Sequence, residues 1–194
     1  LRFLLIHIYT HSLKFDKALK NLRELRDRDK KTGKNPVVLN LLSWNLLLAD
    51  MSASLSEAEK YAVRAYQLRV SPEIINTVAI IRVLKGESEQ AEALLKTTSG
   101  SKKRVDRETN HPITFFLRSI LAKRRGEQYE AIIKRFLDNL GLLTKDELFL
   151  VNELNCETEV MAGFVELETD TRAAPPTGCN IRPSETTPGR AGER

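Results

Sequence analysis

Two histidines spaced four residues apart are the first candidates for chemistry. In HIYTH, residues 7–11, His7 and His11 would share one face of a helix, the spacing with which a zinc-protease helix offers two imidazoles to the metal. Such a helix also needs a glutamate after its first histidine as a general base, and Ile8 stands there. The third histidine, His111, is distant in the sequence. We therefore interpret His7 and His11 as ordinary helix-face residues and expect neither a metal nor a cofactor.

Other catalytic patterns are absent from the sequence. It contains no G-x-S-x-G motif, P-loop or G-x-G-x-x-G motif. Neighbouring carboxylates such as Glu57 and Glu59 belong to charged helical stretches, where solvation explains them. Cys156 and Cys179 lack the spacing of a redox motif or a zinc site, which predicts free thiols in a reducing compartment. We expect no enzyme activity and no small-molecule substrate.

The elements that would carry any site form an internal repeat. The segment SPEIINTVAIIRVLKGESEQAEALLK, from Ser71, aligns without a gap with HPITFFLRSILAKRRGEQYEAIIKRF, from His111, at an offset of 40 residues. The matched pairs are Pro72 with Pro112, Gly86 with Gly126, Glu87 with Glu127 and Ala91 with Ala131. Proline suits the first turn of a helix, and glycine lets the chain reverse between two helices. Each segment therefore predicts a helical hairpin.

An earlier hairpin is predicted from NPVVLNLLSWNLLLAD and LSEAEKYAVRAYQLRVSP. Asn35 and Pro36 would open its first helix as cap and first-turn residue. In the second helix, Ala58, Ala62 and Ala65 are spaced four and three residues apart, so they share one face. Small residues there allow the two helices to approach closely.

These alanines, followed by Pro72, resemble the tetratricopeptide repeat, and the glycine and alanine of the 40-residue repeat match it too. The first segment resembles this family through residues such as Tyr9, Phe15 and Ala18, but Leu13 stands where the turn glycine is usual. The resemblance implies an all-α fold, a right-handed superhelical array (α-solenoid) of about four antiparallel helix hairpins. Two segments depart from the family's pattern. The first is the turn ADMSASLSEA, which is about three residues longer than the family's unit, and the second is the link SGSKKRVDRETNH.

After the fourth hairpin, TKDELFLVNELN contains a capping box of Thr144 with Glu147, ahead of an apolar face of Leu148, Val151 and Leu154. This helix resembles the terminal cap that covers the last apolar surface of a stacked array. The remainder is rich in Pro, Gly, Ser and Thr, which predicts a disordered tail. The predicted ranges are a repeat domain over 1–160, with hairpins at about 1–32, 35–70, 72–99 and 111–140 and a capping helix at about 144–156, and a tail over 161–194.

In arrays of this family the first helices of successive hairpins line a concave groove that binds a peptide or helix. Carried over to this sequence, the groove-facing pattern assigns Asn40, Trp44, Leu47, Glu73, Asn76, Ile80, Val83, Ile113, Phe116 and Ile120. This mostly apolar set predicts a protein-interaction scaffold that binds an amphipathic helix or an extended apolar segment. Two alternatives are that Trp44 is a core residue and that the protein's own C-terminal helix or tail fills the groove.

The family's clamp for acidic chaperone tails is not expected, because its cationic positions hold Leu4, Leu41, Glu73 and Thr77. The net charge of +5 divides into a basic body and a tail of about −3 from Glu157 onward. Acidic residues interrupt the basic runs, so nucleic-acid or acidic-surface binding is the weaker alternative.

No apolar run approaches the roughly 18 to 20 residues of a membrane span. We therefore expect a cytoplasmic protein, or the cytoplasm-facing part of a longer one. The start at Leu1 and a weak likeness to repeats appended to membrane peptidases leave open that the chain is the accessory C-terminal part of a larger enzyme.

Overall fold

The computed structural model describes residues 2–28, 34–97 and 111–158, and Leu1–Met161 form one compact unit. Within the described residues the secondary structure is helical, which confirms the all-α prediction. The predicted tail, Cys179 and the link SGSKKRVDRETN lie outside the described residues. The helices are α1 (Arg2–His11), α2 (Phe15–Arg28), α3 (Pro36–Ala49), α4 (Met51–Leu68), α5 (Pro72–Leu84), α6 (Ser88–Thr97), α8 (Pro112–Arg124), α9 (Glu130–Leu137) and α10 (Lys145–Thr158), with a short 3-10 turn η2 (Leu140–Leu142). None of these helices is long and apolar enough to cross a membrane.

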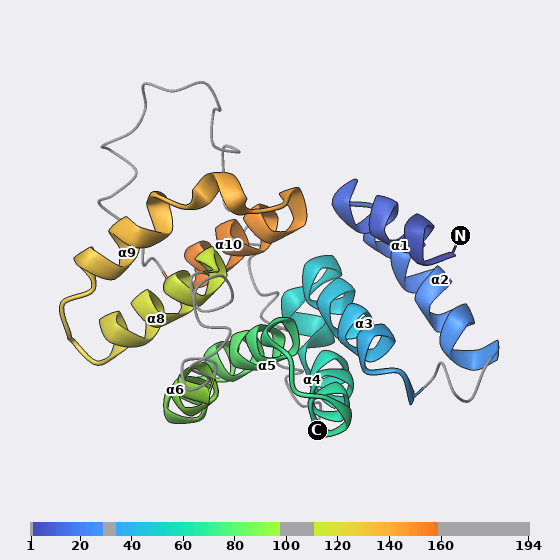
Figure 1. Ribbon diagram of the computed structural model, residues 1–194, viewed down its shortest axis with the longest axis horizontal. Coiled ribbons are helices and arrows are strands. Elements are labelled where there is room, and N and C mark those ends of the chain that lie inside the picture. Colours follow the sequence, from blue (N-terminus) through green and yellow to red (C-terminus); the bar gives the residue numbers. More distant parts are fainter. Residues whose placement is uncertain (1, 29–33, 98–110, 159–194) are drawn as a thin grey trace, which may run out of the picture. The chain divides into compact units, whose positions relative to one another are not determined.

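Consecutive helices pack against each other in pairs (Figure 1). α1 packs on α2, α3 on α4, α5 on α6 and α8 on α9, so each predicted hairpin range contains two packed helices. The pairs are joined by further contacts of α2 with α3 and of α4 with α5, and by contacts among the first helices α3, α5 and α8. In the second pair, Ala58, Ala62 and Ala65 are fully buried on α4, as their spacing predicts.

α5 and α8 are buried over most of their surface. In α5 every residue from 74 to 81 is buried, and α8 buries the runs 112–117 and 119–122. α5 has neighbours on several sides, since it contacts α3, α4, α6 and α8. A helix that is apolar over most of its surface is suited to such an enclosed position rather than to a surface with one exposed face.

Three hairpin turns share one backbone conformation. Gly86 and Gly126 have φ angles of 77° and 69°, in the left-handed region that glycine enters without steric cost, and Leu13 takes the same position with φ 56°. In each turn the next amide donates to the carbonyl five residues back: Lys14 to Tyr9 at 2.8 Å, Glu87 to Arg82 at 2.8 Å and Glu127 to Ala122 at 3.0 Å. The backbone repeat therefore extends to the first hairpin, where the residue type departs from the pattern.

The prediction of a long turn at ADMSASLSEA is wrong, because most of this segment is helical. Asp50 alone joins α3 to α4, with an extended backbone (φ −161°, ψ 97°). Its side-chain oxygen accepts from the Ala53 amide at 2.9 Å and so caps α4, which then begins at Met51. The segment that follows holds no glycine or proline to stop the helix, so a single capping residue serves as the turn.

α10 does more than cover the last hairpin. It contacts α8 and also reaches α3 and α1, the first helices of the second and first pairs. Its buried side chains are Asp146, Leu150, Val151 and Leu154, whereas Leu148, predicted on the apolar face, is 44% exposed. The ring of Phe149 lies 5.5 Å from that of Phe15 at the start of α2. α10 therefore connects the first hairpin to the fourth.

Candidate functional site

One pocket of about 350 Å³ is lined by the first helix of every hairpin together with the start of α10. We call it the first-helix pocket. Its lining comes from α1 (His7, Thr10, His11), α3 (Asn40, Leu41, Trp44), α5 (Pro72, Glu73, Asn76, Thr77), the start of α8 (His111, Ile113) and the start of α10 (Thr144, Asp146, Glu147). A pocket at which so many separate elements converge, and in which several polar side chains meet an apolar surface, is a candidate binding site.

The carboxylate of Asp146 is the polar centre of this pocket. The residue is only 5% exposed, and both of its carboxylate oxygens have hydrogen-bond partners. Oδ1 lies 2.7 Å from Nδ1 of His11, and Oδ2 accepts from the indole Nε1 of Trp44 at 2.9 Å. These partners are 135 and 102 residues away in the sequence. Because a carboxylate only accepts hydrogen bonds, the His11 tautomer that matches this contact carries its proton on Nδ1.

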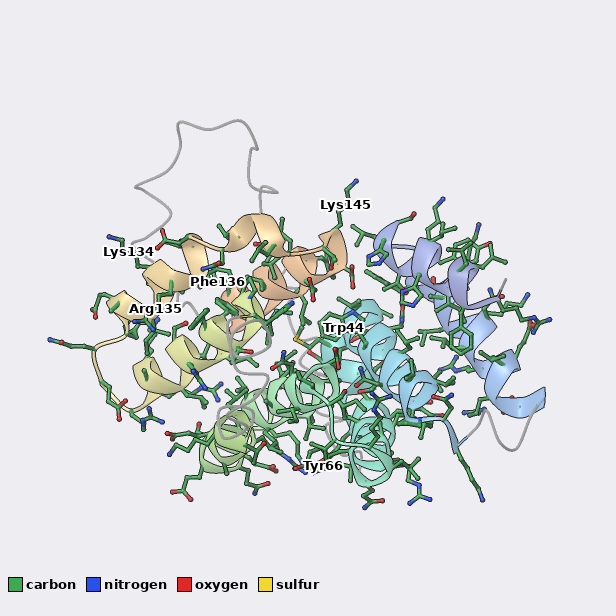
Figure 2. All side chains as sticks on the ribbon, in the orientation of Figure 1. Trp44, Tyr66, Lys134, Arg135, Phe136 and Lys145 are labelled. Atoms are coloured by element: carbon green, nitrogen blue, oxygen red, sulfur yellow. The ribbon has the colours of Figure 1, made fainter. Side chains whose placement is uncertain are left out.

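Local sequence explains how Asp146 is positioned. Both the amide and the hydroxyl of Thr144 donate to Glu147 Oε2, at 2.8 and 2.9 Å, so Glu147 bonds the residue before α10 in one half of the predicted capping box. Asp146 follows in the first helical turn, where a negative charge is favoured by the helix amides. Spacings of four residues then align it with the buried Leu150 and Leu154. Trp44 and Lys145, the residue before Asp146, are labelled in Figure 2.

The ionisable side chains around the pocket are those of Asp, Glu and His. Glu73 is exposed in the first turn of α5, and Glu147 Oε1 lies 3.5 Å from Nε2 of His111. The rings of His7 and His11 stack with their centres 6.0 Å apart. The described lining residues include no Lys or Arg. The pocket therefore offers hydrogen-bond acceptors and imidazoles, and lacks the cations with which proteins bind phosphate groups.

The fold brings together all three histidines of the chain, although sequence distance separated His111 from the other two. Over residues 2–28, 34–97 and 111–158, no group of three His, Cys, Asp or Glu side chains is arranged to hold a metal ion. His11 is instead paired with Asp146, and His111 with Glu147. The converging imidazoles of His11 and His111 thus contact carboxylates in the first turn of α10.

The residues predicted to face a groove divide into two sets. Asn40, Trp44, Glu73, Asn76 and Ile113 do line the first-helix pocket. The others are at most 1% exposed and lie in the core: Leu47, Ile80, Val83, Phe116 and Ile120. For this second set the structure corrects the groove assignment. The physical reason is that these side chains pack between helices: the ring of Phe116, for example, lies 5.0 Å from that of Phe136 on α9, the second helix of the same hairpin.

The two asparagines of the predicted groove set, Asn40 and Asn76, are in different states. Asn76 is 8% exposed and its Oδ1 already accepts from the Thr114 hydroxyl at 3.2 Å, a bond between α5 and α8. A similar pair joins α1 to α3, where the Thr10 hydroxyl lies 2.9 Å from Asn45 Oδ1. Asn40 is half-buried at the pocket, with an Oδ1 that has no protein partner. This Oδ1 is itself buried, so Asn40 would have to shift before that atom could accept a hydrogen bond from a ligand.

Sequence reasoning missed Asp146, the residue with the most specific contacts in the pocket. The sequence did contain a signal, because Asp146 precedes Leu150 and Leu154 by four and eight residues and so shares a helix face with them. Its partners could not be read from that signal, because His11 and Trp44 are on other hairpins. Tyr9, one of the residues through which the first segment resembles the family, is not among the buried residues of α1, which are Ile6 and Thr10.

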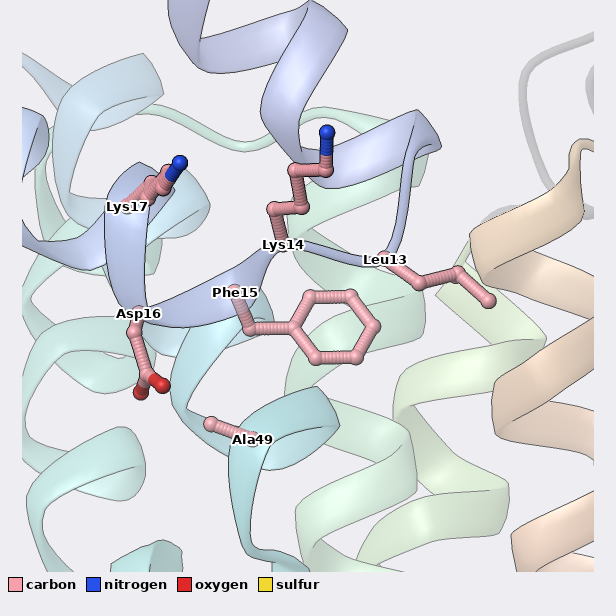
Figure 3. Close-up of a pocket in the computed structure, with 6 residues that line it drawn as sticks. All are labelled: Leu13, Lys14, Phe15, Asp16, Lys17 and Ala49. Atoms are coloured by element: carbon pink, nitrogen blue, oxygen red, sulfur yellow. The ribbon is translucent and has the colours of Figure 1, made fainter.

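A second hollow, of about 280 Å³, lies at the turn between α1 and α2 (Figure 3). The ring of Phe15 lies between Leu13 and Ala49 in this view, and the ammonium groups of Lys14 and Lys17 point away from Ala49. The polar groups of this hollow belong to neighbouring residues of one turn and do not converge from several elements. It has the character of a surface depression beside a turn.

In comparisons with protein-family models, curated proteins and solved structures, the chain matches none of them. The functional argument therefore depends on the geometry of the first-helix pocket.

Proposed function

We propose that this chain is a non-catalytic scaffold of tetratricopeptide type, a superhelical array that binds a segment of a partner protein at the first-helix pocket. One observation carries the proposal, namely that the first helices of all four hairpins contribute side chains to a single pocket. In an array of hairpins the first helices form the surface that is continuous from one repeat to the next, and such arrays use this surface for binding. The shared turn conformation at Leu13, Gly86 and Gly126 supports the family resemblance.

The chemistry of the pocket favours a protein ligand over a nucleic acid. Leu41, Trp44 and Ile113 offer apolar surface, while the exposed carboxylate of Glu73 offers an acceptor for backbone or side-chain donors. Nucleic-acid affinity depends on Lys and Arg contacts to phosphates, and the described lining contains neither residue. The proposal is the same whether the array acts alone or as the accessory region of a larger enzyme.

Site-specific crosslinking tests the proposal. His7 is exposed at the pocket, and Lys60 is exposed on α4, outside the pocket lining. A photoreactive benzoylphenylalanine at position 7 should give a defined protein adduct in extracts of the source cells, and the same group at position 60 should not. Circular dichroism checks that both proteins keep their helix content. Equal adducts at the two positions, or none at position 7, would show that the first-helix pocket is not the binding surface.

A further inference from the structure

The surface that the proposed function assigns to a partner is already covered in part by α10. This helix contacts α8, α3 and α1, and the ring contact of Phe149 with Phe15 extends its reach to the start of α2. Thr144, Asp146 and Glu147, at its beginning, form one wall of the first-helix pocket. α10 therefore sits where a ligand helix would sit in an array that binds helices along its first-helix surface.

The two ends of α10 are held by different forces. Toward its C-terminal part, Leu150, Val151 and Leu154 are fully buried, and the Lys123 ammonium donates to the Thr158 carbonyl at 3.3 Å. At its beginning the specific contacts to the first and second hairpins come from the carboxylate of Asp146, which binds His11 and Trp44. Hydrogen bonds to a buried carboxylate are directional, so they select an acidic residue at this position rather than any polar one.

We propose that α10 is an internal ligand of the first-helix pocket, and that it specifies the chemistry of the partner that replaces it. That partner is an amphipathic helix with an acidic residue in its first turn and apolar residues four, five and eight positions later, the pattern of Asp146, Leu150, Val151 and Leu154. The inference rests on the proposed function, because it names the ligand of the same pocket. It adds that the free protein holds its own copy of the recognition pattern.

The competition is set by chain connectivity. A segment tethered by a short linker, here residues 138–144 between α9 and α10, acts at an effective concentration in the millimolar range. A free helix with the same contacts competes poorly against it. Weakening the internal helix without altering the receptor residues His11 and Trp44 should therefore increase the affinity for an external helix.

Fluorescence anisotropy with a labelled peptide tests this in the full chain. The peptide spans residues 143–158, with Cys156→Ser to prevent oxidation. We expect Asp146→Asn in the protein to tighten peptide binding at least about tenfold, because the internal helix loses a charged acceptor that the peptide retains. Adding Trp44→Phe to that variant should return the affinity to the wild-type value, since the peptide then lacks the indole donor. Asp138→Asn, at the exposed end of α9, is the matched control and should leave binding unchanged.

Equal binding of the peptide to wild type and Asp146→Asn overturns the proposal, as does equal binding of a peptide that itself carries Asp146→Asn. If the protein variant does not fold, amide hydrogen exchange of the wild type decides. The proposal requires the amides of α10 to exchange through openings that leave α5 protected, and exchange of both helices only together would refute it. If the peptide-binding and exchange tests fail but the crosslink at position 7 still forms, the inference about α10 is refuted and the proposed function stands. Failure of both removes the proposed function as well.

Discussion

At the scale of single residues, the turn at Leu13 shows what the backbone requires when the sequence departs from its pattern. A leucine in the left-handed region brings its Cβ close to the following carbonyl, a cost that glycine does not have. The same hydrogen bond from the next amide forms in this turn as in those of Gly86 and Gly126. The packing of the first hairpin therefore holds Leu13 in a conformation that its own side chain disfavours.

Leu13→Gly should raise the free energy of unfolding by about 1 kcal/mol, because it removes this steric cost. Gly86→Ala should lower it by about 1 kcal/mol, since its φ of 77° disfavours alanine although a Cβ there would meet no atom within 4 Å. Urea unfolding followed by circular dichroism measures both changes. A loss of stability in Leu13→Gly would mean that contacts of the leucine side chain outweigh the backbone cost.

Phe116 was expected to face a ligand and is a core residue instead. It is fully buried, and its ring centre lies 5.0 Å from that of Phe136 on α9. Phe116→Ala should lower the free energy of unfolding by about 3 to 5 kcal/mol, the usual cost of such a cavity. Phe3→Ala, at a position 39% exposed, is the control and should change it by less than about 0.5 kcal/mol. Similar effects of the two substitutions would contradict the burial of Phe116.

At the scale of elements, a charged cluster ties the end of α5 to its neighbours. The Arg82 guanidinium lies 2.9 Å from Glu59 on α4 and also pairs with Glu87 in the following turn, and Lys85 contacts both carboxylates. Arg124 on α8 donates to the Val83 carbonyl at 2.7 Å. Polar contacts therefore join α4 of the second hairpin and α8 of the fourth to the end of α5 in the third.

Hydrogen bonds from Arg82, and then from Lys85, lower the pKa of Glu87. A carboxyl whose pKa is lower in the folded protein than in the unfolded chain stabilises the fold above its ordinary pKa of about 4.3, and this contribution is lost as the pH falls through the folded value. The difference in unfolding free energy between wild type and Glu87→Gln should therefore be constant from about pH 5.5 to 7.5 and shrink below about pH 4.

Urea unfolding over that pH range checks this prediction. Glu153→Gln, at an exposed site on α10, serves as the matched control. A difference for Glu87→Gln that keeps its size at low pH would show that the charge of Glu87 does not stabilise the cluster.

At the scale of the whole described unit, α10 provides the long-range connection. Most helix contacts join neighbours in sequence, whereas α10 contacts α1 as well as α8. Stability in arrays of hairpins is approximately a sum of terms between neighbouring repeats. Because α10 contacts both the first and the last hairpin, its packing adds a contribution to the free energy of unfolding that depends on both of them.

Leu150→Ala should therefore reduce amide hydrogen-exchange protection in α1 as well as in α8, because it weakens the packing of α10 on both. Leu95→Ala removes an equally buried leucine from α6, which is not among the helices that α10 chiefly contacts, and should affect α1 much less. Exchange measured by mass spectrometry on the two variants makes the comparison. Equal changes in α1 would show that α10 does not couple the first hairpin to the fourth.

The sequence by itself determined the helices and their order of pairing. Pro36, Pro72 and Pro112 begin helices, and Gly86 and Gly126 take positive φ angles in turns, because these effects act within a few residues along the chain. The start of α4 at Met51 was missed, although it too depends on a local effect. The side chain of Asp50 accepts from the amide of Ala53, three residues later, and this bond caps the helix where the sequence analysis placed a long turn.

Tertiary structure alone decided which side chains meet and which are covered. Asp146 joins His11 and Trp44 across more than 100 residues, and no local pattern encodes such a pairing. Whether Phe116 faces a ligand or the core depends on what packs against α8, which is a property of the other helices and not of its own periodicity. Secondary structure follows from forces between near neighbours in the chain. Burial and the composition of the first-helix pocket follow from contacts between distant ones.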